Sequence, residues 1–467
     1  MLNEAVKNFL ERVRRNKGTA FRYLQDNKIE SVSYEDFVRK CYDEQKEVEK
    51  NGIRSVAFIR ALSLETLVGI FGCLLNNDRV ALIAHMAPLS SILEMQKKAD
   101  TIAVNIEDPM FSPSEKKKIF AQMGQKRKYP TDGHGTLVFF KSDTRERFLP
   151  LEYEMKDFLP QKEIPYLDNL VSTADEIYYI EGYEEVSCFL CNIVTPLFKG
   201  ITVDIGRGSF YIENDLKVLQ PTMIFALPQM VSFLAKRNAF SQGIKKLAIC
   251  GVVSDRVSLS YLVQTGVKVY SFFGPPEVCS IALCSSGTGQ SELFWPAAFV
   301  DVREDNGLLC YRSPFHFSWY FGFPERKREV VDEEGFYHSH TRGKVQPNGS
   351  VFFYGRTDGF VRFPDGVEIN LKDLEDILKG MIPGLNCALT IYKGSLALTY
   401  YSSRLNHEVI EEAVKKINAL TFAKARIRYL REASINLPRD ALGNIKRGEI
   451  NELPLTNEYE VKGERND

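Results

Sequence analysis

Short apolar runs alternate with amphipathic stretches along the chain as far as Phe294. The runs that read as strands are Val56 to Ile59, Thr66 to Leu75, Ala81 to Ile83, Ile102 to Val104, Thr136 to Phe140, Glu176 to Ile180, Thr222 to Ala226, Lys246 to Cys250 and Lys268 to Phe273. Alternation of strands and helices is typical of α/β architecture with largely parallel sheets. We therefore predict an α/β fold for this part of the chain.

Helical patterns occur near the N-terminus and in one long apolar run. Asn3 to Val13 has a helical period, and Ser33 caps a second helix with Asp36 at its third position. Cys188-Phe189-Leu190-Cys191 has redox spacing but lies in an apolar helical run without a second ligand pair. Buried structural thiols are therefore the interpretation that we favour for this pair.

The pattern changes after Phe294 to short strands and turns, with turn signals at Asn306-Gly307, Asn348-Gly349 and Pro364-Asp365-Gly366. This texture predicts a smaller β-rich layer. Further elements are predicted near the C-terminus: a helix near Leu371 to Leu378, strands at Ala388 to Tyr392 and Ser395 to Tyr401, and a helix from His407 to Leu420. The polar residues from Thr456 to Asp467 are predicted to be frayed.

Composition narrows the classes of function. A chain of 467 residues that is 44% hydrophobic can bury a large core and is predicted to form two or three domains. The net charge of -1 gives no bulk field toward nucleic acid or an anionic membrane. The apolar runs are too short for a transmembrane segment, and Met1 to Lys17 lacks an apolar signal core. With nine scattered cysteines, we expect reduced thiols and a cytoplasmic protein.

The most informative motif is Tyr354-Gly355-Arg356-Thr357-Asp358-Gly359, followed by an amphipathic stretch from Gly366 to Leu378. It closely resembles the hinge of the adenylate-forming superfamily, which contains acyl-CoA synthetases, luciferases and the adenylation domains of peptide synthetases. The family pattern is Gly-Arg-x-Asp, then Gly-x-Arg-Ile-Glu-x-x-Glu-Ile-Glu. Arg356 and Asp358 are kept here, and the second arginine is replaced by Glu368.

The resemblance implies a large α/β domain of residues 1-357, with parallel α/β subdomains and a β-rich layer. A hinge at Asp358 links it to a small α+β domain of residues 359-467. In the family the small domain rotates about that hinge between an adenylating and a thioester-forming arrangement, and the same freedom is implied here.

Two further segments resemble family motifs. Ser271-Phe272-Phe273-Gly274-Pro275-Pro276-Glu277 is similar to Asn-x-Tyr-Gly-x-Thr-Glu, in which the threonine touches the α-phosphate and the glutamate helps to hold magnesium. Gly274 and Glu277 are kept, but Pro276 has no hydroxyl group. The segment from Leu437 to Arg447 resembles Leu-Pro-x-Thr-x-x-Gly-Lys-Ile-x-Arg, and the catalytic lysine aligns with Asn444.

The phosphate-binding loop departs most from the family. Thr-Ser-Gly-Ser-Thr-Gly-x-Pro-Lys is replaced by a run that begins at Lys141 and lacks both glycines. Ser142 and Thr144 can still donate hydrogen bonds and Lys141 can attract anions, whereas Asp143 and Glu146 repel phosphates. A solvated charged loop without a nucleotide role is favoured over a rewired phosphate site.

The ribose contact is altered as well. The family's Thr-Gly-Asp falls on Ser339, His340 and Thr341, so no carboxylate is available to accept from the ribose hydroxyls. Arg356 would reach ribose or phosphate in the family, and a structural arginine paired with the Glu-rich helix is the competing account. Gly251 begins a segment similar to the family's Gly-Gly-Ala turn beside the adenine and acyl pocket, although a generic turn would look the same.

His338 and His340 would point to the same side of a strand and suggest a metal. No third ligand stands at a helpful spacing in the sequence. Two surface or nucleotide-pocket histidines are therefore the favoured interpretation.

These substitutions leave two hypotheses. The first is a ligase that uses ATP and Mg²⁺ to activate a small carboxylic acid and then transfers the acyl group to CoA or to the phosphopantetheine thiol of an acyl or peptidyl carrier protein. In this case Glu277 holds the metal, and Lys446, two residues beyond Asn444, replaces the absent lysine. The second is a degenerate homologue that binds an acyl group, a carrier protein or a protein partner without catalysis. Loss of one preorganised donor costs about 100- to 1000-fold in rate, so we expect adenylation to be impaired.

Overall fold

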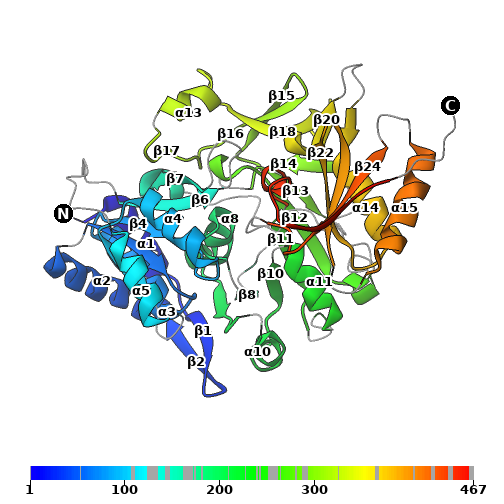
Figure 1. Ribbon diagram of the computed structural model, residues 1–467. Helices are drawn as coiled ribbons and strands as arrows, with labels where there is room; N and C mark the ends of the chain where they lie inside the picture. The colour runs from blue at the N-terminus through cyan, green and yellow to red at the C-terminus, as the bar shows by residue number, and fades with distance from the viewer. Residues whose placement is uncertain are drawn as a thin grey trace. The chain divides into compact units, whose positions relative to one another are not determined.

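The computed structural model of the chain describes residues 2–52, 54–106, 111–123, 135–141, 148–160, 172, 175–179, 182–208, 210–226, 228–237, 240, 243–250, 261–262, 264–278, 281–286, 293–323, 325–362, 368–402, 405–421, 426–439 and 445–461. It forms two compact units (Figure 1). The large unit comprises Met1–Ser339 and Lys344–Phe353, and the small unit comprises His340–Gly343 and Tyr354–Asp467. The hinge role of Asp358 stays a prediction.

The larger sheet of the large unit has thirteen strands. In spatial order they are β15 (Asp301–Asp305), β16 (Leu308–Arg312), β18 (Tyr337–Val345), β19 (Val351–Arg356), β14 (Leu293–Pro296), β13 (Leu283–Ser286), β12 (Lys268–Phe273), β11 (Lys246–Cys250), β10 (Met223–Ala226), β8 (Glu176–Tyr179), β9 (Thr202–Ile205), β1 (Thr19–Gln25) and β2 (Lys28–Ser33). The run from β12 through β11, β10, β8 and β9 to β1 is parallel. The strands from β12 to β14 and those of the β15–β16 hairpin pair antiparallel. The short strands and turns predicted after Phe294 are present, but they continue the same sheet, and antiparallel pairing begins earlier, at β12.

A second sheet of six strands completes the large unit. Its order is β17 (Trp319–Tyr320), β7 (Leu149–Glu154), β6 (Thr136–Lys141), β4 (Arg79–Leu82), β3 (Ser55–Ile59) and β5 (Ala103–Ile106). The strands from β6 to β5 are parallel, and β7 returns antiparallel beside β6. The predicted α/β class is confirmed.

Helices connect these strands. They are α1 (Glu4–Arg14), α2 (Tyr34–Asn51), α3 (Leu64–Leu75), α4 (Leu89–Ala99), α5 (Pro113–Ala121), α6 (Met155–Phe158), α8 (Val186–Phe189), the π-helix η1 (Leu190–Val194), α9 (Thr195–Lys199), α10 (Ile212–Leu219), α11 (Pro228–Lys236), the 3-10 turn η3 (Pro276–Val278) and α13 (Glu325–Val330). As predicted, Ser33 caps α2 by accepting from the backbone N–H of Asp36.

One strand prediction was wrong. The run from Thr66 to Leu75 lies in helix α3, which Ser63 caps at its N-terminus. Ten of its residues are buried, so the helix has no polar face to reveal a helical period. A short apolar run of this kind cannot be assigned to helix or strand from its pattern alone.

The small unit is an α+β body with its own core. Its elements are the 3-10 turn η4 (Thr357–Gly359), β20 (Phe360–Arg362), β21 (Glu368–Asn370), α14 (Leu371–Met381), β22 (Asn386–Tyr392), β23 (Ser395–Tyr401), α15 (His407–Leu420), β24 (Ile427–Ala433), α16 (Arg447–Ile450) and β25 (Leu455–Glu460). The prediction that the chain frays from Thr456 was wrong for the residues that the structure describes, because β25 pairs with β24. Backbone pairing rather than apolar side chains holds this polar edge strand.

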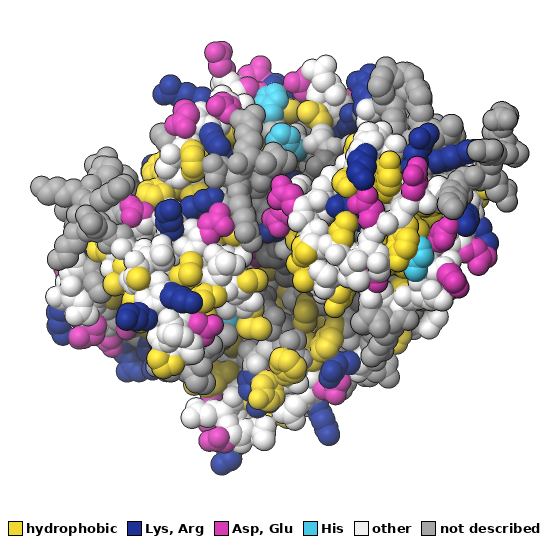
Figure 2. Space-filling view, in the orientation of Figure 1, with side chains coloured by type: hydrophobic (Ala, Val, Ile, Leu, Met, Phe, Trp, Pro, Cys, Tyr) yellow, Lys and Arg dark blue, Asp and Glu magenta, His cyan; other side chains and the backbone are white. Residues whose placement is uncertain are grey.

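Positive and negative side chains are interspersed on the visible face of the molecule (Figure 2). This mixture agrees with the near-zero net charge. Eight cysteines lie among the described residues, and all eight are free thiols, as predicted. No helix in the described part of the chain has the length and apolar character needed to cross a membrane.

Candidate functional site

Glu277, the residue that the family motif assigns to magnesium, lies in η3 directly after β12 and is 0% exposed. The ammonium of Lys141, the last residue of β6, forms an ion pair with Glu277 Oε1. The Tyr320 hydroxyl donates to the same oxygen at 2.7 Å. Two residues far from Glu277 in the sequence therefore converge on one carboxylate oxygen.

The backbone around Glu277 is also held by the neighbouring sheet. The Tyr153 hydroxyl of β7 donates to the carbonyl of Pro276. The backbone N–H of Phe317 donates to the carbonyl of Glu277 at 2.9 Å. Gly274 lies between β12 and this fixed turn. Since β7 also pairs with β17, Tyr153 and Tyr320 approach the same turn from two adjacent strands.

Magnesium does not fit Glu277 as the structure shows it. Mg²⁺ keeps several of its waters and binds through negative oxygen ligands that it can reach. Glu277 Oε1 is taken by Lys141 and Tyr320, and Oε2 is buried without a hydrogen-bond partner. Burial, with the negative charge of Glu277 beside it, raises the pKa of Tyr320. The negative charge of Glu277 is thus balanced by Lys141 inside the protein.

Several predicted site residues fall outside the described residues: Ser142, Asp143, Thr144, Glu146, Gly251 and Asn444. Their roles stay predictions. Of the residues that we predicted for the phosphate loop, the structure describes Lys141, whose ammonium forms an ion pair with Glu277.

The positions that align with the family's ribose contact lie on β18. Ser339 and Thr341 are on its buried side, whereas His338 and His340 alternate with them on the more exposed side. The Ser339 hydroxyl is already engaged, because it donates to the carbonyl of Leu309 at 2.6 Å. Arg356, at the end of β19, is exposed.

The C-terminal motif places its two basic residues differently. Lys446 is largely buried, with its ammonium 3.6 Å from Glu449. Arg447 donates to Glu375 of α14 through its two terminal guanidinium nitrogens, at 2.6 Å and 3.1 Å. Arg447 also donates to the carbonyl of Leu389, whose N–H donates to Glu375 at 2.7 Å. The motif arginine therefore ties helix α14 to strand β22.

Sequence reasoning missed Tyr153, Tyr320 and the Arg447–Glu375 pair. Both tyrosines lie outside the family motifs that we matched, so no local signal marked them. Arg447 and Glu375 each stand at a charged position of the family pattern, but 72 residues separate them. Their pairing is visible only in the folded unit.

Comparisons with known proteins agree with this fold. No family model matches the chain. The structure is similar to an O-succinylbenzoate coenzyme A synthetase from Bacillus subtilis in complex with ATP and magnesium ion, with a TM-score of 0.77, 14% identity and coverage of 95% of this chain and 99% of that chain. It is also similar to an anthranilate CoA ligase in complex with anthranoyl-AMP, with a TM-score of 0.74, 14% identity and coverage of 97% of each chain.

A sequence match is more local. Over 183 residues, 36% of this chain, the sequence is 21% identical to a long-chain-fatty-acid–CoA ligase from Gallus gallus, and the match spans 23% of that relative. The chain has the fold of the adenylate-forming superfamily, so the resemblance carried by the motifs is confirmed at this level.

Proposed function

We propose that this protein keeps the adenylate-forming fold but binds a small carboxylic acid, or an acyl group derived from one, without efficient ATP-dependent adenylation. The observation that carries the proposal is the buried ion pair between Lys141 and Glu277. In the family the equivalent glutamate helps to hold magnesium. Here a lysine ammonium supplies the positive charge, so a metal ion would have to displace an ion pair that is already formed.

A second feature supports the proposal that the protein still binds an acid or acyl group. Asn192, in the π-helix η1, is fully buried, and both polar atoms of its side chain lack a partner. Thr195, three residues further along, also has a buried unpaired hydroxyl. An unpaired buried polar group costs about 1–3 kcal/mol, so such groups need an explanation in a ligand or a bound water. The resemblance to the family implies that the helix following Gly182-Tyr183, which includes these residues, corresponds to the segment that usually walls the acyl pocket.

Magnesium-dependent nucleotide binding tests the first part of the proposal. Calorimetry with ATP and Mg²⁺ should show binding in the millimolar range or none. Lys141→Thr restores the residue type of the family's loop and frees Glu277, so Mg²⁺ alone should then raise the melting temperature. Lys98→Thr, which removes a lysine paired with Glu94 on α4, is the matched control and should gain no response to Mg²⁺. Micromolar binding of Mg²⁺-ATP by the unmodified protein would contradict the proposal.

A thermal-shift panel of aliphatic and aromatic acids tests the second part. A ligand that binds the folded state raises the melting temperature with the logarithm of its concentration. Asn192→Leu should abolish the shift without destabilising the protein, because it replaces unpaired polar atoms with an apolar side chain. If no acid shifts the unmodified protein, only a carrier-protein or other protein partner remains.

A working ligase is the second candidate, and the retained Glu277 and Arg356 favour it. Such an enzyme would activate a carboxylic acid with ATP and pass it to CoA or to a carrier-protein thiol, with Lys446 in place of the catalytic lysine. Pyrophosphate exchange that is abolished by Lys446→Ala would support it. We expect instead that Asn444→Lys produces no exchange, because the altered phosphate loop already weakens binding of the triphosphate. A cytoplasmic location stays a prediction.

A further inference from the structure

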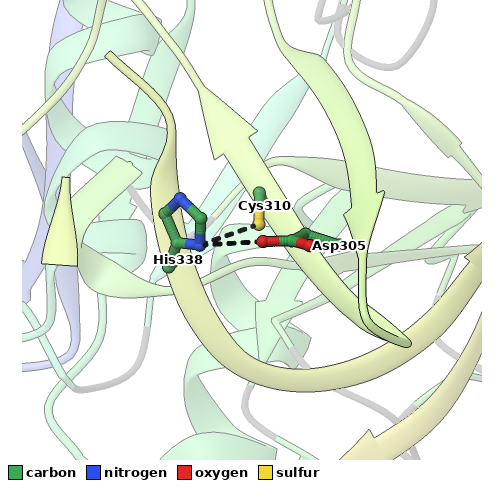
Figure 3. A group of neighbouring side chains, drawn as sticks. All are labelled: Asp305, Cys310 and His338. Carbon is green, nitrogen blue, oxygen red and sulfur yellow. Dashed lines mark hydrogen bonds and ion pairs between the residues drawn. The ribbon is translucent and has the colours of Figure 1, made fainter. Parts of the chain in front are cut away.

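Three side chains that can bind a metal converge at one edge of the larger sheet. Asp305 ends β15, Cys310 lies on β16 and His338 lies on β18, which neighbours β16. The turn at Asn306-Gly307, with positive φ at both residues, forms the hairpin that brings Asp305 and Cys310 together. Figure 3 shows the three side chains directed toward one another.

Their separations suit one small cation. Cys310 Sγ lies 3.5 Å from His338 Nδ1, and Asp305 Oδ2 lies 3.8 Å from the same nitrogen. The three donor atoms lie within 4.8 Å of one another. In a tetrahedral zinc site with Zn–S of about 2.3 Å and Zn–N of about 2.0 Å, the sulfur and nitrogen are about 3.5 Å apart. The cysteine and histidine therefore already have the required spacing.

The second nitrogen of His338 is fixed by a carboxylate. Nε2 lies 2.8 Å from Asp332 Oδ2, and the other oxygen of Asp332 accepts from the backbone N–H groups of Glu334 and Phe336. Arg303 also contacts Asp332. A hydrogen bond from Nε2–H to this carboxylate leaves the Nδ1 lone pair directed toward Cys310 and Asp305. Metal-binding histidines are oriented in this way by an outer carboxylate.

The same residues resemble a nucleophile, a base and an orienting acid, but two observations disfavour that role. The side chain of Cys310 is fully buried, so a substrate cannot reach the sulfur. Asp305 beside it disfavours the thiolate that attack requires. Asp305 does not disfavour a metal ion, because the positive charge of the ion neutralises both the Cys310 thiolate and the Asp305 carboxylate. The ion can enter past Asp305 and His338, whose side chains are 48% and 36% exposed.

We propose that Asp305, Cys310 and His338 form a zinc site with three protein ligands and one open position. A mixed set of thiolate, imidazole and carboxylate ligands is typical of zinc, whereas magnesium and calcium prefer oxygen alone. The open position takes water or an external ligand. The site draws on elements distinct from β6 and η3, which carry Lys141 and Glu277, so it does not depend on the function proposed above.

The test uses the full chain stripped of metal with a chelator and titrated with Zn²⁺ by calorimetry and with Co²⁺ by absorbance. One equivalent should bind, and the Co²⁺ form should show a thiolate-to-metal charge-transfer band. Cys310→Ser should abolish that band and weaken Zn²⁺ binding by more than about 100-fold. Asp332→Asn should weaken it by about 10- to 100-fold, as expected for an outer carboxylate.

Cys284→Ser is the matched control, since Cys284 is a partly exposed thiol elsewhere in the large unit. It should leave binding unchanged. The melting temperature of metal-free Cys310→Ser should remain close to that of the unmodified protein, because serine is nearly the same size as cysteine and can keep the contact to His338. Absence of stoichiometric binding, or equal binding by the unmodified protein and Cys310→Ser, would overturn the proposal.

Discussion

A buried ion pair lies in each unit, and the two pairs differ in how completely they are satisfied. In the small unit, both oxygens of Glu375 are bonded to Arg447, and one also accepts from the backbone of Leu389. In the large unit, one oxygen of Glu277 receives Lys141 and Tyr320, while the other is buried without a partner. Both pairs contain residues of the superfamily's motifs.

This difference separates two reasons for which a motif residue can be present. A fully bonded pair such as Arg447–Glu375 stabilises a fold, and its arginine is already occupied within its own unit. An incompletely bonded carboxylate such as Glu277 is what the proposed function expects where a lysine has taken the place of a metal ion. Removing one partner of a buried pair costs far more than the net contribution of the pair itself. Substitutions therefore give a direct measure of the contrast.

The largest effect is expected for Arg447→Met. It leaves Glu375 buried without its cation and should destabilise the small unit by about 3–5 kcal/mol. Both tryptophans, Trp295 and Trp319, belong to the large unit, so tryptophan fluorescence reports that unit alone. A lower urea midpoint by circular dichroism with an unchanged fluorescence midpoint is the expected result. Arg447→Lys keeps the charge but loses the bidentate contact, so its urea midpoint should lie between those of the unmodified protein and Arg447→Met.

A smaller effect of opposite sign is expected for Asp78→Asn. Asp78, like Glu277, is a buried carboxylate with an unpaired oxygen, and Arg54 lies 3.7 Å from its other oxygen. Burial raises the pKa of Asp78 to about 7 in the folded protein, above its value in the unfolded chain. The folded state therefore holds this proton more tightly, and the stability from it is lost as pH rises from about 4 through 7.

Asp78→Asn removes that loss. The variant should gain about 1–3 kcal/mol relative to the unmodified protein above pH 7 and little near pH 4. Urea unfolding at a series of pH values measures the difference. A difference that does not change with pH would show that Asp78 is ionised normally and that incomplete pairing is tolerated.

Glu277→Gln should have a still smaller effect, of about 1 kcal/mol. The amide oxygen can still accept from Tyr320, and Lys141, whose side chain is 15% exposed, can turn its charge toward water. Tryptophan fluorescence from Trp319, beside Tyr320, should report the urea midpoint. A loss as large as that for Arg447→Met would remove the distinction between the two pairs.

The last prediction concerns the connection between the units and involves no change in sequence. If residues near Asp358 act as a hinge, limited proteolysis should cut between Arg356 and Arg362 and leave a stable large fragment. The cut small unit should retain the circular dichroism of an α+β domain, because its core is its own. Cleavage that begins only at global unfolding would count against a mobile hinge.

The sequence by itself determined the features that depend on neighbouring residues. The Ser33 cap, the Asn306-Gly307 turn and the strands Lys246 to Cys250 and Lys268 to Phe273 follow from short-range geometry, and the structure has them as predicted. The resemblance to the superfamily was also evident, because the motifs that carry it are contiguous stretches of residue types. For His338 the same dependence on neighbouring residues was a limit. The sequence shows no third metal-binding residue close to His338 and His340, so it favoured no metal there.

Only the tertiary structure decided what the charged and metal-binding residues contact. Lys141 and Glu277 are 136 positions apart, and Cys310 and His338 are 28 apart. Lys141 and Glu277 meet because the end of β6 lies beside the turn that follows β12. Cys310 and His338 meet because β16 neighbours β18. The prediction was wrong for the largely buried helix at Thr66 to Leu75 and for the polar strand β25 for a related reason. Packing against or pairing with distant residues stabilises both, and local pattern does not reveal it. Sequence pattern reports local preference, whereas a site is a set of distances between distant residues, which only the packed chain defines.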